Sequence, residues 1–410
     1  MGLAGLAWAL LVLSPTQTKL AGLLWVIVCV WPIILAWRAL SPIRSSTSTG
    51  KAAHGWLMAC SITLGTWFLI SVYWSEPCCK PSAELNAGLR LWLGALATYL
   101  WTRYWTPIAT WKKRINQALA LACMASLIIA IIMHRGQLPA YPIAWSAAMA
   151  MVLALLFPQA LALPQDAPQR TWWLLCSAMG LAAVLLSQSR GSYLVMIWLV
   201  YLWGAASPSA RAKVRPLQIA ITATLAAAAI GLTAALPSDP LRMREGWNDW
   251  TTSRHSETQN TSIGARFALY ELALKTIAES PWVGVGARER LDRIHTLGLD
   301  LPQQEADKLA HAREQGHVHN AFLHSAMDGG IISLVGFLAS IGGLLYTAKA
   351  LWHNHPIARQ QMLGLAFVHA STSLSNVNLA HNYYVVMLSL CAMLVILQAL
   401  SEDATTPGDN

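Results

Sequence analysis

Long runs of apolar residues, separated by short polar segments, set the pattern of this chain. A helix needs about 20 mostly apolar residues to cross the hydrocarbon layer of a membrane, and twelve runs reach or approach that length. The first run lacks the basic leader and the small-residue cleavage site of a signal peptide, so it too is expected to be a membrane helix. The pattern predicts an all-α integral membrane protein with about twelve transmembrane helices, at residues 2–14, 20–37, 56–74, 87–105, 118–133, 142–163, 171–189, 192–206, 217–237, 331–351, 362–379 and 382–400.

The basic residues between these runs predict the orientation in the membrane. Thirteen of the 28 lysines and arginines fall in one set of short connections, and five fall in or beside the other set. Cytoplasmic connections are enriched in lysine and arginine, and an even number of spans leaves both ends of the chain on one side. We therefore expect both termini in the cytoplasm, with residues 401–410 as a cytoplasmic tail.

One long polar segment, residues 238–318, interrupts the membrane pattern between the ninth span (within 1–237) and the last three (within 319–400). It holds 22 of the 47 charged residues, and connections of this length are usually functional or disordered. Residues 263–280 carry apolar side chains at helical spacing before Pro281: Ile263, Phe267, Tyr270, Leu274 and Ile277. Further helical stretches follow at 287–297 and 303–315. The segment predicts a helical cap on the outer face; the alternative is a solvated loop without a site.

Composition narrows the class of protein further. Hydrophobic residues make up 55% of the chain and charged residues 11%, whereas soluble domains carry about 25% charged residues. A soluble enzyme, a disordered chain and a nucleic-acid binder are excluded on this basis. The net charge of +9 is explained by orientation in the membrane and requires no acidic partner. Five of the seven cysteines fall inside predicted spans as small apolar residues; Cys78 and Cys79 are adjacent in a loop, and no C-x-x-C pair suggests zinc.

Two arginines are candidates for anion binding. Arg190, in SQSRGSY, lies between two apolar spans with almost no loop, where a cation is costly unless it is paired or lines a wet cavity. Arg266 lies in the first turns of the predicted helix 263–280, where a guanidinium fork suits phosphate oxygens. The alternatives are an interfacial arginine that reaches lipid head groups for Arg190, and a solvated charge for Arg266.

His317 and His319 are candidates for acid–base chemistry. Both lie in HVHN, just before a predicted span. Two histidines without a clear carboxylate partner are weak evidence for a metal site, whereas an imidazole near arginines stays neutral and can act as a general base. A polar helix cap at the membrane surface is the alternative. The chain has no DxD motif, P-loop or GxSxG motif, and Asp328 is the exception to a near absence of carboxylates in the spans.

Together these features resemble the bacterial O-antigen ligases. The resemblance rests on about twelve spans, SRG at a span junction, a late external segment with G-x-R-x-x-x-Y followed by PWVGVG, and then HN ahead of a glycine pair. The ligase signature has a histidine, then Asn, Ser or Gln, nine residues, a glycine, two residues, and Gly, Thr or Val. Here His319-Asn320 is followed nine residues later by Gly330, and Ser333 occupies the last position.

The resemblance implies a metal- and cofactor-independent, inverting glycosyltransferase of the C-type membrane fold in the bacterial inner membrane. It implies transfer of O-antigen from undecaprenyl pyrophosphate to a sugar hydroxyl of lipid A–core oligosaccharide at the periplasmic face, among membrane lipids. Arg190 and Arg266 would hold the pyrophosphate and His319 would accept the proton. Tyr270, Arg288 and His317 are second-tier candidates.

Three other functions remain open at this stage. A polymerase of the same superfamily would join repeat units carried by two lipid-linked donors. A lipid or solute transporter would show internal repeats and broken spans in matching positions, which the sequence lacks. A non-catalytic scaffold would make the arginines and His319 dispensable.

Overall fold

The computed structural model describes residues 2–38, 48–74, 83–108, 110–133, 137–206, 239, 241–254 and 260–405. These residues form helices and turns with no strand among them, which confirms the all-α prediction. The predicted helix 217–237 and the cysteines Cys78 and Cys79 lie outside the described residues.

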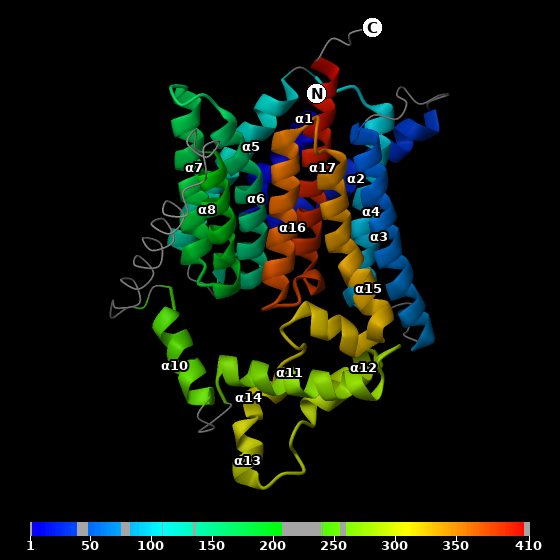
Figure 1. Ribbon diagram of the computed structural model, residues 1–410, viewed down its shortest axis with the longest axis vertical. Helices are drawn as coiled ribbons and strands as arrows, with labels where there is room; N and C mark the ends of the chain where they lie inside the picture. Colours follow the sequence, from blue (N-terminus) through cyan, green and yellow to red (C-terminus); the bar gives the residue numbers. More distant parts are fainter. Residues whose placement is uncertain are drawn as a thin grey trace.

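The main body is a bundle of roughly parallel and antiparallel helices (Figure 1). Each predicted span other than 217–237 overlaps a helix of this bundle. Its helices are α1 (Gly2–Leu13), α2 (Thr18–Arg38), α3 (Ser48–Tyr73), α4 (Ala83–Tyr104), α5 (Trp111–Ile132), α6 (Pro142–Ala162), α7 (Pro168–Leu186), the short η2 (Arg190–Leu194), α8 (Val195–Ala206), α15 (Ala321–Ala350), α16 (Pro356–Ser373), η4 (Asn378–Ala380) and α17 (Asn382–Thr405).

Six helices in the described part are long and apolar enough to cross a membrane: α2, α3, α5, α6, α15 and α17. Large apolar side chains such as Leu23, Phe68 and Ile132 are exposed on the outer faces of the bundle, where a soluble protein would place polar ones. These features indicate a multi-pass membrane protein. The total of twelve spans is not confirmed; α1 and α8 have 12 residues each and rise only about 18 Å.

The core of the bundle lies around α6 and α17. The apolar window of α17 is fully buried and that of α6 is 94% buried, whereas that of α2 is only 28% buried. Both central helices are apolar around their whole circumference, as expected for helices surrounded by other helices. The five described cysteines are free and buried in the bundle, as the sequence predicts: Cys29, Cys60, Cys123, Cys176 and Cys391.

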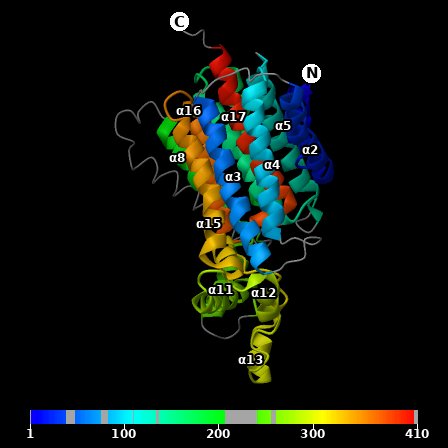
Figure 2. The same cartoon turned by 90° about the vertical axis from the view of Figure 1, so that its right-hand side faces the viewer.

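The cap forms at the end of the bundle opposite the start of α1 and the end of α17 (Figure 1, Figure 2). It contains α10 (Met243–Arg254), α11 (Ser262–Glu279), α12 (Gly286–His295), α13 (Gln303–Lys308) and α14 (Ala310–Arg313), and α11 lies across the end of the bundle. The cap has its own small apolar core, which includes Leu269, Val285, Ile294 and Val318. The helices predicted at 263–280, 287–297 and 303–315 are therefore present.

The buried face of α11 differs from the predicted apolar stripe. Phe267 and Leu274 are exposed, and the buried positions are instead Gly264, Ala265, Ala268, Leu269, Ala273 and Thr276. Small side chains let α11 approach α15 and α14 closely, so packing distance rather than hydrophobicity selects the buried side. Thr261 caps the helix by accepting a hydrogen bond from Gly264 N at 3.0 Å.

Helix α15 belongs to both parts of the molecule because it bends sharply at a glycine pair. Gly329 and Gly330 leave the helical conformation, and Gly330 has φ of +60°. A Cβ on Gly330 would lie 2.2 Å from the backbone carbon of Trp282, so only glycine fits. The segment before the bend joins the cap core through Met327, and the segment after it runs into the bundle.

Candidate functional site

Arg190 is held at a tight turn between two bundle helices. Helix α7 ends at Leu186, Gln188 adopts a left-handed φ of 57°, and the one-turn η2 begins at Arg190. The single hydrogen of the Tyr193 hydroxyl is shared between Leu185 O at 2.9 Å and Leu241 O at 3.3 Å, which connects this turn to the chain entering the cap. The turn directs Arg190 toward the cap, where its Nη1 donates to Arg242 O at 3.3 Å.

Arg190 and Arg266 line one small polar pocket between the bundle and the cap. Its lining comes from α6, the turn between α7 and η2, the residue before α10, α11 and the chain after α16: Ile143, Gln188, Ser189, Arg190, Gly191, Arg242, Ser262, Arg266 and Ser375. Two sequence candidates 76 positions apart are thus brought together. The cavity volume is about 40 Å³. Two larger cavities lie within the bundle, away from these residues.

The pocket carries excess positive charge. Arg242 is ion-paired with Glu245, but neither Arg190 nor Arg266 has a carboxylate partner among the described residues. Burial lowers the pKa of Arg266; Tyr270 opposes this shift and Arg190 adds to it. Arginine nevertheless remains charged at neutral pH. Asp249 of α10 interacts electrostatically with these arginines, which lower its pKa. Burial and, after it, repulsion from Glu245 outweigh this effect and raise the pKa of Asp249.

His319 lies at the junction of the cap and α15. Its backbone has a left-handed φ of 57°, and the side chain of the next residue, Asn320, caps α15 by accepting from Phe322 N and Leu323 N at 3.0 and 3.2 Å. Only 8% of His319 is exposed. Burial lowers its pKa to about 4, with the positive charge of Arg266 as the next cause and the nearby amide of Asn376 opposing. His319 is therefore neutral at physiological pH.

The hydrogen bonds of Gln315 define the free nitrogen of His319. Gln315 Nε2 donates to His311 O at 3.0 Å, so its Oε1 is the atom facing His319 Nε2 at 2.8 Å. Since an amide oxygen only accepts, the neutral His319 carries its hydrogen on Nε2. Nδ1 then holds the free lone pair, and this atom is buried without a hydrogen-bond partner in the described part of the chain.

Tyr270 connects the helix that carries Arg266 to the backbone at His319. It lies one turn after Arg266 on α11, and its hydroxyl is 3.2 Å from His319 O and 3.3 Å from Leu374 O. Burial raises the pKa of Tyr270, although Arg266 opposes this effect, so the hydroxyl keeps its proton and acts as a donor.

The other second-tier candidates differ in position. The rings of His317 and His319 are 4.2 Å apart, and burial, followed by the neighbouring histidines His319, His324 and His381, lowers the pKa of His317 to about 2. Arg288 is exposed on α12 and does not line the arginine pocket. The buried arginine of α12 is Arg290, two positions later.

The sequence analysis did not identify three residues of this region. Arg242 lines the pocket, Gln315 orients His319, and Asn376 influences the pKa of His319. Asn376 was assigned to the predicted span 362–379, but α16 ends at Ser373. The polar run Ser371–Asn378 inside that predicted span was a usable signal for a segment outside the membrane core. Arg242 and Gln315 stand among many polar cap residues, and the sequence has no local feature that distinguishes them.

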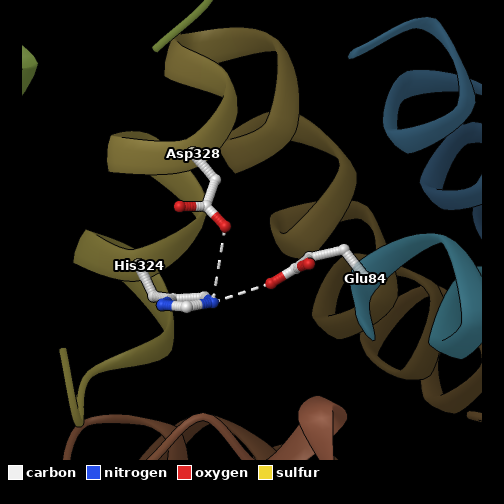
Figure 3. Close-up of side chains that lie close together, drawn as sticks. All are labelled: Glu84, His324 and Asp328. Carbon is white, nitrogen blue, oxygen red and sulfur yellow. Dashed lines mark hydrogen bonds and ion pairs between the residues drawn. The ribbon is translucent and has the colours of Figure 1, made fainter. Parts of the chain in front are cut away.

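One group of described residues has the spacing of metal ligands. Glu84 from α4 and His324 and Asp328 from α15 point toward one another, with their ligand atoms within 4.8 Å (Figure 3). His324 Nε2 is 2.7 Å from Glu84 Oε1 and 3.6 Å from Asp328 Oδ2. A cation is already present, because Arg290 Nε lies 2.5 Å from Asp328 Oδ1. The donor set therefore suits an ion-pair network better than a metal ion.

Fold and site together define a multi-pass membrane protein with an arginine-lined pocket and a neutral histidine beneath a helical cap. Residues 175–338 match the family model described as O-antigen ligase, and this segment contains Arg190, Arg266, His319 and the glycine pair. The match covers 164 of the 410 residues, and over this segment the chain is similar to the O-antigen ligases. An uncharacterized protein of Haemophilus influenzae is 30% identical over 174 residues, which cover 40% of this chain and 41% of that relative.

Proposed function

We propose that this protein is an O-antigen ligase of the bacterial inner membrane. In this proposal it transfers an O-antigen polysaccharide from undecaprenyl pyrophosphate to a sugar hydroxyl of lipid A–core oligosaccharide, as a metal-independent, inverting glycosyltransferase. The observation that carries the proposal is the placement of Arg190 and Arg266 in one pocket, with a buried neutral His319 within electrostatic reach of Arg266.

The two arginines suit the leaving group. A pyrophosphate ester leaves with growing negative charge, and preformed cations in a site shielded from water stabilise that charge in the transition state. The cavity of about 40 Å³ holds no more than a few waters. The diphosphate would therefore bind between Arg190 and Arg266 at its mouth, and the saccharide would lie outside.

His319 suits the proton transfer. The acceptor hydroxyl oxygen forms a bond to the anomeric carbon, the bond from that carbon to the pyrophosphate oxygen breaks, and the electron pair leaves with the lipid carrier. His319 Nδ1 takes the hydroxyl proton. Attack opposite the leaving group inverts the anomeric centre, and general-base assistance contributes about 10²- to 10⁴-fold in rate.

The location of the pocket suits a lipid-linked donor. The pocket lies between the end of the bundle and the cap, where a head group at the membrane surface meets the protein while the polyprenyl chain stays among membrane lipids. The distribution of basic residues favours the periplasmic face for this end.

A polymerase of the same superfamily is the nearest alternative. The chain departs from the ligase signature at Ser333, and the surroundings of this residue in the structure are relevant to the choice. Ser333 is buried, and a Cβ on Gly329 would lie 2.4 Å from the Ser333 Cβ. In size, serine lies between the glycine and the threonine or valine of the signature, so its side chain falls within the range that the signature accepts at this position. The departure from the ligase signature is therefore compatible with a ligase.

A transfer assay with purified full-length protein tests the proposal. Undecaprenyl-pyrophosphate-linked O-antigen and rough lipopolysaccharide are incubated with the protein and a chelator, and products are separated by gel electrophoresis. A ladder on lipopolysaccharide that the His319→Ala variant fails to form is expected. Longer chains on the lipid carrier alone would identify a polymerase, and neither product would contradict both enzymatic proposals.

A further inference from the structure

The ion-pair network of Glu84, His324, Asp328 and Arg290, at the junction of bundle and cap, extends to the loop that carries His319. Arg290 makes two connections from α12: its Nε pairs with Asp328 Oδ1, and its Nη1 donates to Gly316 O, each at 2.5 Å. Gly316 is three residues before His319 and directly follows Gln315, which orients the His319 ring. One buried guanidinium therefore connects the bend of α15 to the loop bearing the proposed base.

The network is anchored in the bundle on its other side. Asp328 lies 3.6 Å from His324, and His324 lies 2.7 Å from Glu84 at the start of α4 (Figure 3). Side-chain exposure is 7% for both Arg290 and Asp328, 3% for His324 and 12% for Glu84. The set therefore brings the Arg290 guanidinium and the His324 ring together with two buried carboxylates. Such a group is strongly disfavoured when one partner is removed, because a charge is then left buried and unpaired.

Backbone hydrogen bonds also join α12 to the bend of α15, but they do not reach the loop around Gly316. Val285 N donates to Met327 O at 3.0 Å, and Ile331 N donates to Pro281 O at 2.8 Å, so α12 and the bend of α15 are fixed together by their main chains. In the described structure, the side chain of Arg290 is what extends from this rigid junction to Gly316 O. The Arg290 contact thus has a role that the backbone pairing does not duplicate.

We propose that Arg290, supported by Asp328, His324 and Glu84, is a positioning unit that sets the place and burial of His319 for transfer. The inference rests on the proposed function and adds residues that touch neither substrate. The groups that face His319 are Arg266 of α11, His311, His317 and His324, together with the uncharged Gln315 and Asn376. Release of the loop would admit water to His319 and weaken the influence of Arg266.

The test compares Arg290→Lys with the matched control Arg293→Lys on the same helix. A lysine cannot form both fixed connections of the guanidinium fork, whereas Arg293 forms partly exposed pairs with Glu279 and Glu289, which contribute little. Transfer is measured with full-length protein in lipid nanodiscs, as kcat and donor KM across pH. We expect Arg290→Lys to lower kcat about 10- to 100-fold, since small misplacements of reacting groups have effects of this size. Donor KM is expected to stay the same because Arg190 and Arg266 are untouched.

The acid limb of the pH profile separates positioning from folding. In the wild type, kcat/KM should fall with the His319 pKa of about 4. In Arg290→Lys the limb should move upward, toward the ordinary histidine value of about 6.5, because His319 loses burial. Activity reduced by the same factor at every pH, with the limb unmoved, would overturn the proposal, as would an unchanged kcat.

Two conservative variants keep the inference testable if Arg290→Lys folds poorly. Glu84→Gln and Asp328→Asn keep the side-chain shape, and each is expected to shift the limb in the same direction. Combined with Arg290→Lys, Asp328→Asn should add little, because the effects of residues that act as one unit are non-additive.

A stoichiometric divalent metal in the wild type that is lost in Glu84→Gln would instead identify a metal centre and overturn the proposal. A wild type without transfer activity would refute the proposed function itself, which distinguishes the two failures.

Discussion

The hydroxyl of Tyr270 donates to the main-chain carbonyl of His319, 49 residues further along the chain. The same hydroxyl lies 3.3 Å from Leu374 O, in the segment after α16. One side chain of the cap helix α11 therefore fixes the backbone at the proposed base and the backbone that leads to Asn376.

Replacing Tyr270 with phenylalanine removes this connection and keeps the ring. A hydrogen bond of this kind contributes about 1 kcal/mol, so we expect kcat to fall about five-fold with little change in donor KM. The steady-state kinetics of transfer give both constants. Tyr201→Phe is the control, because Tyr201 is exposed on α8; an equal loss in both variants would show that the Tyr270 contact is unimportant.

The pH dependence of transfer should differ between the free protein and the donor complex. A general base must be neutral, so activity falls as pH drops through the pKa of His319, which is about 4 in the free protein. A bound diphosphate brings negative charge that favours the protonated ring and raises this pKa. The acid limb of kcat, which reports the complex, is expected at higher pH than that of kcat/KM. Coincident limbs would argue against a base close to the diphosphate.

Gln315→Glu should shift the same limb in a predictable direction. A carboxylate facing His319 Nε2 stabilises the imidazolium, so the pKa of His319 rises and the acid limb of kcat/KM moves to higher pH. Gln315→Leu removes the acceptor, and we expect reduced kcat because the hydrogen is no longer confined to Nε2. If both variants retain the wild-type profile, Gln315 does not select the tautomer of His319.

The bend in α15 should depend on Gly330 but not on a glycine further along the same helix. Gly330→Ala forces a side chain into a positive-φ position, which costs about 1–3 kcal/mol, and into contact with the Trp282 backbone. We expect a lower Tm in detergent and loss of transfer. Gly342→Ala is the matched control, since a Cβ there meets nothing within 4 Å, and its Tm should equal or exceed that of the wild type.

The sequence predicted most of the helices but not how they combine into a site. Period and run length were sufficient for α11 and for most of the bundle. The family motifs selected Arg190 and Arg266, which line one pocket, and His319, which lies within electrostatic reach of Arg266; the roles of all three stay predictions. The contact between Arg190 and Arg242 depends on the turn at Gln188. Arg290, and not Arg288, is the buried arginine because its side of α12 faces Asp328. Both follow from tertiary packing, which local periodicity does not encode. The buried side of α11 was missed for the same reason.

The helix at the centre of the bundle, α17, follows all the other described helices in the sequence. It packs against α2, α3, α4, α5, α6 and α16, and its apolar window is fully buried. During synthesis the earlier described helices must therefore enter the membrane before the helix that fills their centre has been made. Completion of the core has to wait for α17: a chain interrupted before residue 382 would leave the inner faces of α4 and α6 uncovered by it, however well its cap had formed.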